Sequence, residues 1–338
     1  MKKFLAGCAL LLMQSAAVAG AGAQAQGPPT TGRMFAAVLL VRGSVVGNST
    51  GGFGLYVRSS ASDTSWRKIT KGNIISFGMG QFDNGRTRRL YLAGGNGLHR
   101  STDGGETWKI ITSWRTEEIL GVVPDPVDSA MMYVSTPFGG FKTTDDGLTW
   151  NRKMNGINPW YIQRIIMDGR DRSVLYAAGE SDLFRTTDGG ESWRGMGSGC
   201  REILAVLQHP VRREVILVAG EEAGIRRTTD GGATWSAARG LEGTSVYTFR
   251  ASPDGRSLYA AGWQTGIWRS TDDGASWEQL WTGPDAEAVY SLFVDPANPA
   301  HLMVGSVAKG LFESLDGGAH WKYAGLTGAQ VKQIEIYP

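Results

Sequence analysis

The sequence is poor in cysteine and histidine, with two cysteines and four histidines among 338 residues. Cys8 lies in the N-terminal apolar segment, so Cys200 is the only cysteine expected in the processed chain and an internal disulfide is excluded. The sequence contains no metal-ligand cluster, phosphate-binding loop or nucleophile motif. We therefore predict neither a cofactor nor a metal, and a fold that depends on its hydrophobic core.

The chain also lacks an excess of either charge: 34 basic and 32 acidic residues give a formal net charge of +2. Nucleic-acid binding requires a basic face, so we predict no nucleic-acid partner. Residues 1–25 combine Lys2 and Lys3 with an apolar run and small-x-small sites, which predicts a signal peptide and an exported protein, periplasmic or extracellular. The apolar run is too short for a transmembrane anchor. Leu5–Cys8 resembles a lipoprotein cleavage box, but the apolar run continues after Cys8.

Segments with a helical period of ten or more residues are absent, whereas an eight-residue motif recurs at a nearly constant interval. The motif is STDGGETW at Ser101–Trp108, and a degraded copy, SSASDTSW, ends at Trp66. The seven motif tryptophans are 42 to 44 residues apart. Each interval holds four short β-rich runs separated by turn residues, which is typical of a propeller blade. The sequence therefore predicts an all-β, seven-bladed β-propeller of four-stranded blades.

The first and last units are incomplete in complementary ways. Residues 34–66 supply three strands without a first strand, and residues 331–338 read as a first strand with nothing after it. We predict that the C-terminal strand pairs with the N-terminal blade and closes the ring, because closure removes exposed sheet edges. The predicted domains are a linker at 26–33 and a propeller at 34–338, with blade 1 formed by 34–70 plus 331–338; the protein is expected to be a monomer.

The repeated motif itself is predicted to be structural. Its Asp and Gly suit a tight turn between the third and fourth strands, and its Trp suits burial in the blade. Calcium loops need ligand oxygens at alternate positions, and TDGGET does not supply them. The structural residues are Asp103, Trp108, Asp145, Trp150, Asp188, Trp193, Asp230, Trp235, Asp272, Trp277, Asp316 and Trp321.

This motif resembles the Asp-box, or BNR, repeat. One copy per blade is similar to the propellers of photosystem II assembly factors and, more distantly, to those of sortilin-type receptors and xyloglucanases. The resemblance covers about residues 34–338 and implies a fold more than a function, because the motif occurs in both binding proteins and enzymes. Such propellers bind through the face opposite the motif turns.

That opposite face provides the candidate binding residues. Exposed aromatic rings among a few charges suit a protein or sugar partner, whereas the plainer interpretation is that each ring caps its own blade. A long loop in the first blade, Arg42–Gly54, departs from the repeat length, as functional loops often do. The predicted binding residues are Trp114, Arg115, Phe138, Trp160, Tyr161, Arg164, Trp263 and Trp281.

The predicted innermost strands contain a row of small or polar residues that we expect to face a central channel. The row comprises Ser76, Gly121, Arg164, Ala205, Thr248, Ser291 and Gln333. Arg164 is its charged member and is interpreted either as a salt-bridged structural residue or as an anion contact. Arg250 and Glu335 lie two residues further along their strands and are candidates for the same channel.

Two functions remain open, and the first is preferred. The chain is predicted to be a non-catalytic assembly or scaffold factor that binds a protein partner. The alternative is a glycan-binding protein or a glycoside hydrolase, for which Glu117, Glu180, Asp182 and Glu221 are candidate carboxylates, although their separations decide whether hydrolysis is possible. The Arg-Ile-Pro motif of sialidases is absent, and no catalytic residue is assigned.

Overall fold

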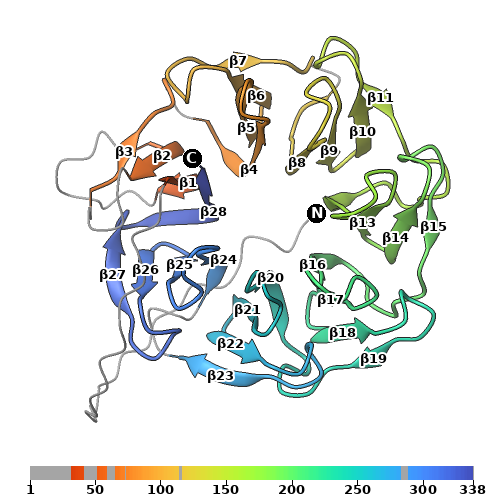
Figure 1. Ribbon diagram of the computed structural model, residues 1–338, viewed down its shortest axis with the longest axis vertical. Helices are drawn as coiled ribbons and strands as arrows, with labels where there is room; N and C mark the ends of the chain where they lie inside the picture. The colour runs from red at the N-terminus through yellow and green to blue at the C-terminus, as the bar shows by residue number, and fades with distance from the viewer. Residues whose placement is uncertain are drawn as a thin grey trace.

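The computed structural model describes residues 32–41, 52–58, 65–72, 74–113, 116–282 and 288–337. Seven four-stranded antiparallel sheets form a ring around a central opening (Figure 1), which confirms the predicted seven-bladed propeller. All regular structure in these residues is strand, and no helix among them has the length and apolarity that a membrane crossing requires. The predicted signal peptide and almost all of the linker lie outside the described residues.

The first four blades follow the order that the repeat predicted, from the innermost to the outermost strand. Blade 1 consists of β28 (Ala329–Tyr337), β1 (Arg33–Val41), β2 (Gly54–Arg58) and β3 (Arg67–Lys68). Blade 2 consists of β4 (Ser76–Asp83), β5 (Arg88–Gly94), β6 (Gly97–Ser101) and β7 (Lys109–Ile110). Blade 3 consists of β8 (Gly121–Pro124), β9 (Met132–Thr136), β10 (Gly139–Thr143) and β11 (Asn151–Arg152). Blade 4 consists of β12 (Ile162–Met167), β13 (Leu175–Gly179), β14 (Leu183–Thr186) and β15 (Arg194–Gly195).

The remaining three blades repeat this arrangement. Blade 5 consists of β16 (Ile203–Gln208), β17 (Ile216–Gly220), β18 (Ile225–Thr228) and β19 (Ser236–Ala237). Blade 6 consists of β20 (Ser245–Ala251), β21 (Leu258–Trp263), β22 (Ile267–Ser270) and β23 (Glu278–Trp281). Blade 7 consists of β24 (Val289–Val294), β25 (Leu302–Ser306), β26 (Gly310–Ser314) and β27 (Lys322–Gly325).

The ring is closed as predicted, by pairing of the C-terminal strand with the first described strand. β28 runs antiparallel to β1, from the pair Arg33–Tyr337 to the pair Val41–Ala329. β28 thereby becomes the innermost strand of a blade whose other three strands come from the N-terminal part of the chain. Neither end of the array is left as an unpaired inner edge, so the aggregation risk of an open sheet is removed.

The hydrophobic core is divided among the seven seams between neighbouring blades. Each seam contains one cluster of buried apolar side chains drawn from two adjacent sheets. At the seam between blades 5 and 6, for example, Leu217 packs with Phe249 and the motif residue Trp277. Strands whose two faces are both buried account for the runs of consecutive buried residues in β9, β13 and β17. Each blade therefore depends on both neighbours for its burial.

The seam between blades 7 and 1 also contains a buried ionic network. Arg58 Nη2 lies 2.9 Å from Glu313 Oε1, which also accepts a hydrogen bond from His301 Nε2 at 2.9 Å. His301 Nδ1 lies 3.0 Å from Asp295 Oδ2. Burial opposes the ionisation of Glu313, yet the hydrogen bond from His301 and the charge of Arg58 hold its pKa at about 2. The seam that closes the ring thus pairs its buried charges.

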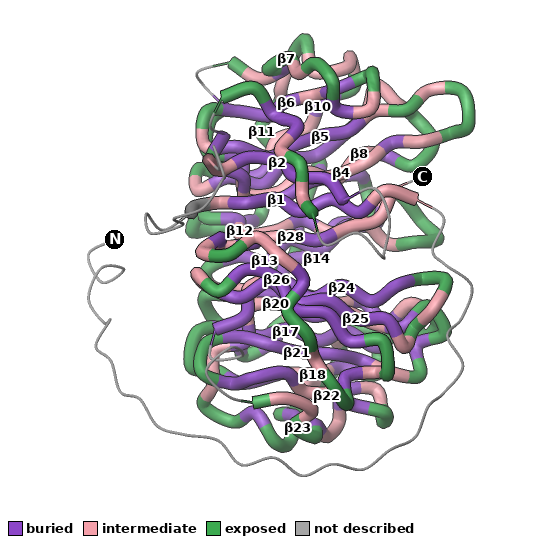
Figure 2. The backbone as a smooth tube through the Cα atoms, turned by 90° about the vertical axis from the view of Figure 1, so that its left-hand side faces the viewer, coloured by how far each residue is buried: buried purple, intermediate pink, exposed green. Residues whose placement is uncertain are grey.

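The alternation of strand direction gives the ring two faces. In every blade the turn from first to second strand and the motif turn from third to fourth strand lie on one side, which we call the motif face. The turn from second to third strand and the connection to the next blade lie on the other side, the opposite face. Seen edge-on, the buried strand segments fill the interior and the exposed turns follow the two rims (Figure 2).

Candidate functional site

The motif turns share one hydrogen-bond pattern, which blade 4 illustrates. The Thr186 hydroxyl donates to Asp188 Oδ1 at 2.6 Å and accepts the Gly190 N–H at 3.1 Å. Asp188 Oδ1 also accepts the Ser192 N–H at 3.0 Å, and Gly190 has a φ of 91°, a backbone region that favours glycine. The same bonds recur around Asp103, Asp145, Asp230, Asp272 and Asp316.

These bonds stabilise the ionised form of each motif aspartate. The hydroxyl and the N–H of Thr107, together with the Ser101 hydroxyl, hold the pKa of Asp103 at about 2. Equivalent donors lower the pKa of Asp145, Asp188 and Asp230. In the last copy His320 replaces the hydroxyl residue, and its Nδ1 lies 2.6 Å from Asp316 Oδ2. The carboxylates are therefore occupied by their own turns, as a structural role requires.

The motif tryptophans join the turns to the blades. Trp150, Trp193 and Trp235 donate through Nε1 to carbonyls of the preceding blade, at 2.9, 3.0 and 3.0 Å. Trp66, in the degraded first copy, donates in the same way to Ala324 of blade 7 at 2.8 Å. The indoles of Trp108, Trp277 and Trp321 instead donate within their own turns. The motif face thus contains groups whose hydrogen-bonding capacity is used by the fold.

The opposite face carries an aromatic cluster over blades 3 and 4. We define this cluster as Phe138, Arg152, Trp160 and Tyr161. The side chains of Phe138 and Trp160 are 57% and 58% exposed, and that of Tyr161 is 37% exposed. The Arg152 guanidinium lies 4.4 Å from the centroid of the Trp160 ring, and its Nε donates to the Phe138 carbonyl at 3.1 Å. Arg152 therefore connects an aromatic residue of the β9–β10 turn with one of the connection between blades 3 and 4.

The segment that presents Trp160 is fixed to its surroundings. Its buried residue Ile157 donates a backbone hydrogen bond to Met154 at 3.0 Å, and the backbone N–H of Trp193 donates to Asn155 at 2.8 Å. The Ser181 hydroxyl donates to the Asn158 carbonyl at 3.1 Å. A ring on such a segment loses little conformational freedom when a partner binds, so the cluster is pre-organised.

The other predicted binding residues are placed differently. Trp263, at the end of β21, is 39% exposed on the opposite face of blade 6, away from the aromatic cluster. The Trp281 ring stacks on Trp321 at a centroid distance of 5.0 Å and contacts Phe312 at 5.3 Å, so it packs inside the seam between blades 6 and 7. Trp114 and Arg115 lie outside the described residues, as does the Arg42–Gly51 part of the long loop.

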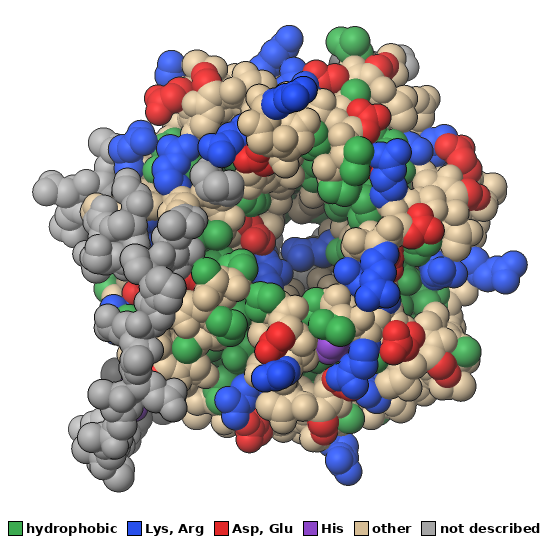
Figure 3. Space-filling model, in the orientation of Figure 1, with side chains coloured by type: hydrophobic (Ala, Val, Ile, Leu, Met, Phe, Trp, Pro, Cys, Tyr) green, Lys and Arg blue, Asp and Glu red, His purple; other side chains and the backbone are tan. Residues whose placement is uncertain are grey.

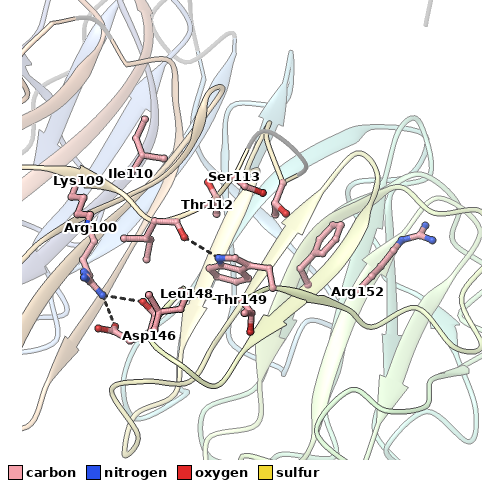
Figure 4. A pocket seen from close by; sticks show the side chains of 14 residues that line it. Arg100, Lys109, Ile110, Thr112, Ser113, Asp146, Leu148, Thr149 and Arg152 are labelled. Atoms are coloured by element: carbon pink, nitrogen blue, oxygen red, sulfur yellow. Dashed lines mark hydrogen bonds and ion pairs between the residues drawn. The ribbon is translucent and has the colours of Figure 1, made fainter.

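A groove adjoins the aromatic cluster at the seam between blades 2 and 3. It has a volume of about 610 Å³, and its walls include Ile110, Phe141, Leu148 and Trp150, with Arg152 at its edge. The Trp150 indole donates to the Ile111 carbonyl at 2.9 Å in this groove. Figure 4 shows Arg100 paired with Asp146 at its side. Arg152 thus belongs to both the groove and the aromatic cluster.

Two of the four candidate carboxylates, Asp182 and Glu221, are engaged by neighbouring groups. Asp182 accepts hydrogen bonds from the Ser198 hydroxyl at 2.5 Å and from the Gly197 N–H at 2.7 Å, which commits it to a turn. Burial raises the pKa of Glu221, as do a hydrogen bond with Glu202 and the charges of Glu202 and Glu222. Two carboxyls in direct contact leave no space for the glycosidic bond that a hydrolase places between them.

Arg164 lies in β12 at the central opening, where it forms no hydrogen bond or ion pair with any described residue. The equivalent positions of blades 5, 6 and 7 follow the same bulge of the inner strand as Arg164 does. Ala205, Thr248 and Ser291 are buried, and the Ser291 hydroxyl donates to the Val331 carbonyl of the next blade at 3.0 Å.

Ser76 was wrongly aligned in the predicted row of channel-facing residues. Gly78, rather than Ser76, occupies the position equivalent to Arg164, because each follows a bulge of its inner strand. The predicted alignment fails in blade 2, whose inner strand begins at Ser76 and runs on to Asp83. The bulge shifts the side-chain alternation by one residue.

Sequence reasoning missed Arg152 as a member of the site. It occupies a two-residue outer strand, and β11 pairs it with Phe141 of β10. The signal available was that blade 3 alone places an arginine at this position, where the other motif blades have Ile110, Gly195, Ala237, Gln279 and Tyr323. Its reach across the turn to Phe138 and Trp160 required the fold.

Solved structures provide likenesses of fold. A GH74 enzyme from Niastella koreensis has a TM-score of 0.61 and 18% identity, covering 77% of this chain and 46% of its own. The GH74 xyloglucanase from Xanthomonas campestris has a TM-score of 0.61 and 18% identity, covering 76% of this chain and 46% of its own. YCF48 bound to D1 peptide gives a TM-score of 0.55 with 18% identity, 74% of this chain and 81% of its own.

These likenesses establish the propeller fold alone, because the identities are low. The chain spans about half the length of the GH74 enzymes that it resembles. No protein-family profile matches the sequence. No curated protein matches it either. The neighbours include both GH74 enzymes and a protein solved with a bound peptide, so the choice of function depends on the site.

Proposed function

We propose that this protein is an exported, non-catalytic propeller that binds a protein partner through the opposite face, as an assembly or scaffold factor in the periplasm or outside the cell. The observation that carries the proposal is the exposed, pre-organised aromatic cluster around Arg152 and Trp160. Tryptophan, tyrosine and arginine are the residues most enriched at binding hot spots. Soluble monomers seldom expose such apolar surface without a function.

The groove supports this proposal by extending the apolar surface beyond the rings. Its lining places Phe141 and Trp150 beside the Arg152 side chain, and Ile110 is 42% exposed at its wall. A partner segment seated on Trp160 could therefore continue into a concave apolar surface, which adds contact area without a new charge. YCF48, a protein of similar fold, has been solved with a peptide bound.

The alternative is a glycan ligand, because an exposed indole such as Trp160 also stacks on sugar rings and GH74 enzymes share the fold. Hydrolysis of that glycan is less well supported. Glu221 contacts Glu202 directly, and Asp182 is engaged in a turn. A binding role for the cluster needs neither residue.

The test is capture of partners from a native envelope extract by the wild-type protein and by Trp160→Ala. We expect a specific protein to be retained by the wild type and lost with Trp160→Ala. Val127→Ala is the matched control, because Val127 is 70% exposed but lies in the turn between β8 and β9 on the motif face, outside the groove. Retention of the same proteins by Trp160→Ala would refute the proposed site. Binding on a glycan panel that Trp160→Ala abolishes, without protein capture, would establish the alternative.

A further inference from the structure

The inner strands around the central opening share a bulge at equivalent positions. The pairing registers skip one residue in five of these strands, namely Phe77, Gln163, Leu204, Tyr247 and Tyr290. β28 skips Lys332 in the same way where it pairs with β1. A bulge re-aims the side chain of the extra residue, so these positions form one ring of side chains around the opening.

Lys332 is the cation of this ring and rests on aromatic side chains rather than on a carboxylate. Its Nζ lies 3.5 Å from the centroid of the Tyr290 ring. Tyr290 in turn stacks on Tyr247, with a centroid distance of 4.7 Å and an interplanar angle of 20°. Lys332 forms no hydrogen bond or ion pair with the described residues. A cation–π contact orients the ammonium group but leaves its three donors available.

Arg164 is the second cation at the opening without a partner among the described residues. Burial and the charge of Arg250 lower the pKa of Arg164 to about 10, and burial and Arg164 lower the pKa of Lys332 to about 8. β12 and β28 are both innermost strands, so Arg164 and Lys332 belong to the walls of the same central opening (Figure 1). Both groups nevertheless carry their proton at neutral pH.

The carboxylate near these cations is already engaged. Glu335 Oε1 lies 2.8 Å from Arg250 Nη2 and accepts a hydrogen bond from Gln333 at 2.9 Å. Glu335 therefore pairs with Arg250 and its charge also acts on Arg164, so that Arg164, Arg250 and Lys332 share one carboxylate and leave an excess of positive charge. Figure 3 shows basic side chains gathered around the central opening, with an acidic side chain at one side.

We propose that the central channel binds a small oxyanion, a phosphate or a carboxylate, between the Arg164 guanidinium and the Lys332 ammonium group. An arginine presents paired N–H donors that match two oxygens of such an anion, and the lysine adds a point charge. This site is separate from the aromatic cluster and does not depend on the proposed protein partner.

The test is isothermal titration of the purified full-length protein with inorganic phosphate and, separately, with malonate, at pH 7 and constant ionic strength. We expect saturable binding of at least one anion. Arg164→Gln and Lys332→Gln should each weaken it by about tenfold or more, because each removes a charge-assisted contact. Lys309→Gln is the matched control, since Lys309 is exposed and the charge change is the same. The two ligands distinguish a phosphate site from a carboxylate site.

A second readout separates an anion site from a structural arginine. Without added anion, Arg164→Gln should melt at the same temperature as the wild type or higher, because the substitution removes repulsion from Arg250 and Lys332. Added phosphate or malonate should then stabilise the wild type more than Arg164→Gln. Absence of binding to the wild type, equal binding by Arg164→Gln and Lys332→Gln, or a lower melting temperature of Arg164→Gln in anion-free buffer would overturn the proposal.

Discussion

The motif face and the opposite face are built from the same strands but treat their polar and apolar groups differently. On the motif face the carboxylate of Asp103 accepts bonds from its own turn, and its pKa falls to about 2. On the opposite face the pKa of Glu221 is raised, and Trp160 is 58% exposed. Satisfied groups stabilise the fold, whereas exposed rings and unpaired charges are available for a partner. The repeated part of the sequence therefore marks the scaffold, and its irregular part marks the site.

Both faces depend on the closed ring, so the largest loss of stability is expected when the ring is opened. Deletion of residues 329–338 removes β28, the pairing partner of β1 and the innermost strand of blade 1. We expect loss of cooperative unfolding and aggregation on concentration, measured by thermal melts and light scattering. A truncated protein that melts like the full-length chain would contradict closure through β28. Deletion of Pro338 alone is the control and should have no effect on either measurement.

The next largest change in stability is expected from replacing one of two tryptophans that belong to different faces. Trp193 is buried and donates to Lys153 of the preceding blade, so Trp193→Ala should lower the free energy of unfolding by about 3–5 kcal/mol. Trp160→Ala removes an exposed ring and should change it by less than about 0.5 kcal/mol. Denaturant titration of both variants measures the difference. Similar losses of unfolding free energy in the two variants would contradict the distinction between the faces.

A smaller effect is expected within one motif turn. Thr143 is fully buried, and its hydroxyl donates to Asp145 and accepts the Gly147 N–H at 3.0 Å. Thr143→Val should lower the free energy of unfolding by about 1–3 kcal/mol, because the Gly147 N–H is left unpaired. Thr149→Val removes an exposed hydroxyl from the same turn and serves as control, since water replaces its bond. A larger loss for Thr149→Val would show that the buried hydroxyl is not the turn's anchor.

The smallest effect concerns the dependence of stability on pH. Partial burial opposes ionisation of Asp272, but bonds from Ser276 and Ser270 hold its pKa at about 2, below the unfolded value of 3.8. The unfolded chain therefore binds more protons, and the stabilisation from Asp272 is present above about pH 4 and is lost as the pH falls towards 2. Asp272→Asn should make the acid loss of stability shallower in denaturant titrations between pH 5 and 2.

Glu221 is expected to affect the pH dependence of stability in the opposite direction. Its pKa is raised in the folded state, so the folded chain binds more protons at this site than the unfolded chain does. The ionised Glu221 therefore destabilises the fold most above its folded-state pKa. Glu221→Gln should therefore increase stability at pH 7 and steepen the loss of stability on acidification. The same change of slope in Asp272→Asn and Glu221→Gln would contradict the assignment of the two carboxyls to different environments.

The sequence predicted the architecture well because the repeat encodes it directly. The four short β-rich runs expected in each interval are the four strands of each blade, and the return of β28 to blade 1 followed from the incomplete first and last units. The glycine conformations and the hydrogen bonds of Asp145 and its equivalents also follow from the motif.

The site was less predictable, because it depends on contacts between different repeats. Phe138 and Trp160 were recognised from their loops, whereas Arg152 needed the fold to show that it bridges them. A stack such as Trp281 on Trp321 has the same sequence signature as an exposed ring, so burial could not be assigned in advance. The bulges in the inner strands likewise hid Lys332, since a single skipped residue changes which side chain faces the channel.

The most direct test of the difference between the faces is site-specific photocrosslinking in the native host. A photoreactive phenylalanine analogue is placed at Phe138, which is 57% exposed beside Arg152, and in a second strain at Val127, which is 70% exposed in the β8–β9 turn on the motif face, outside the groove. We predict a discrete crosslinked partner from position 138 and none from position 127. Crosslinks of equal yield from both positions, or from position 127 alone, would contradict the assignment of binding to the opposite face.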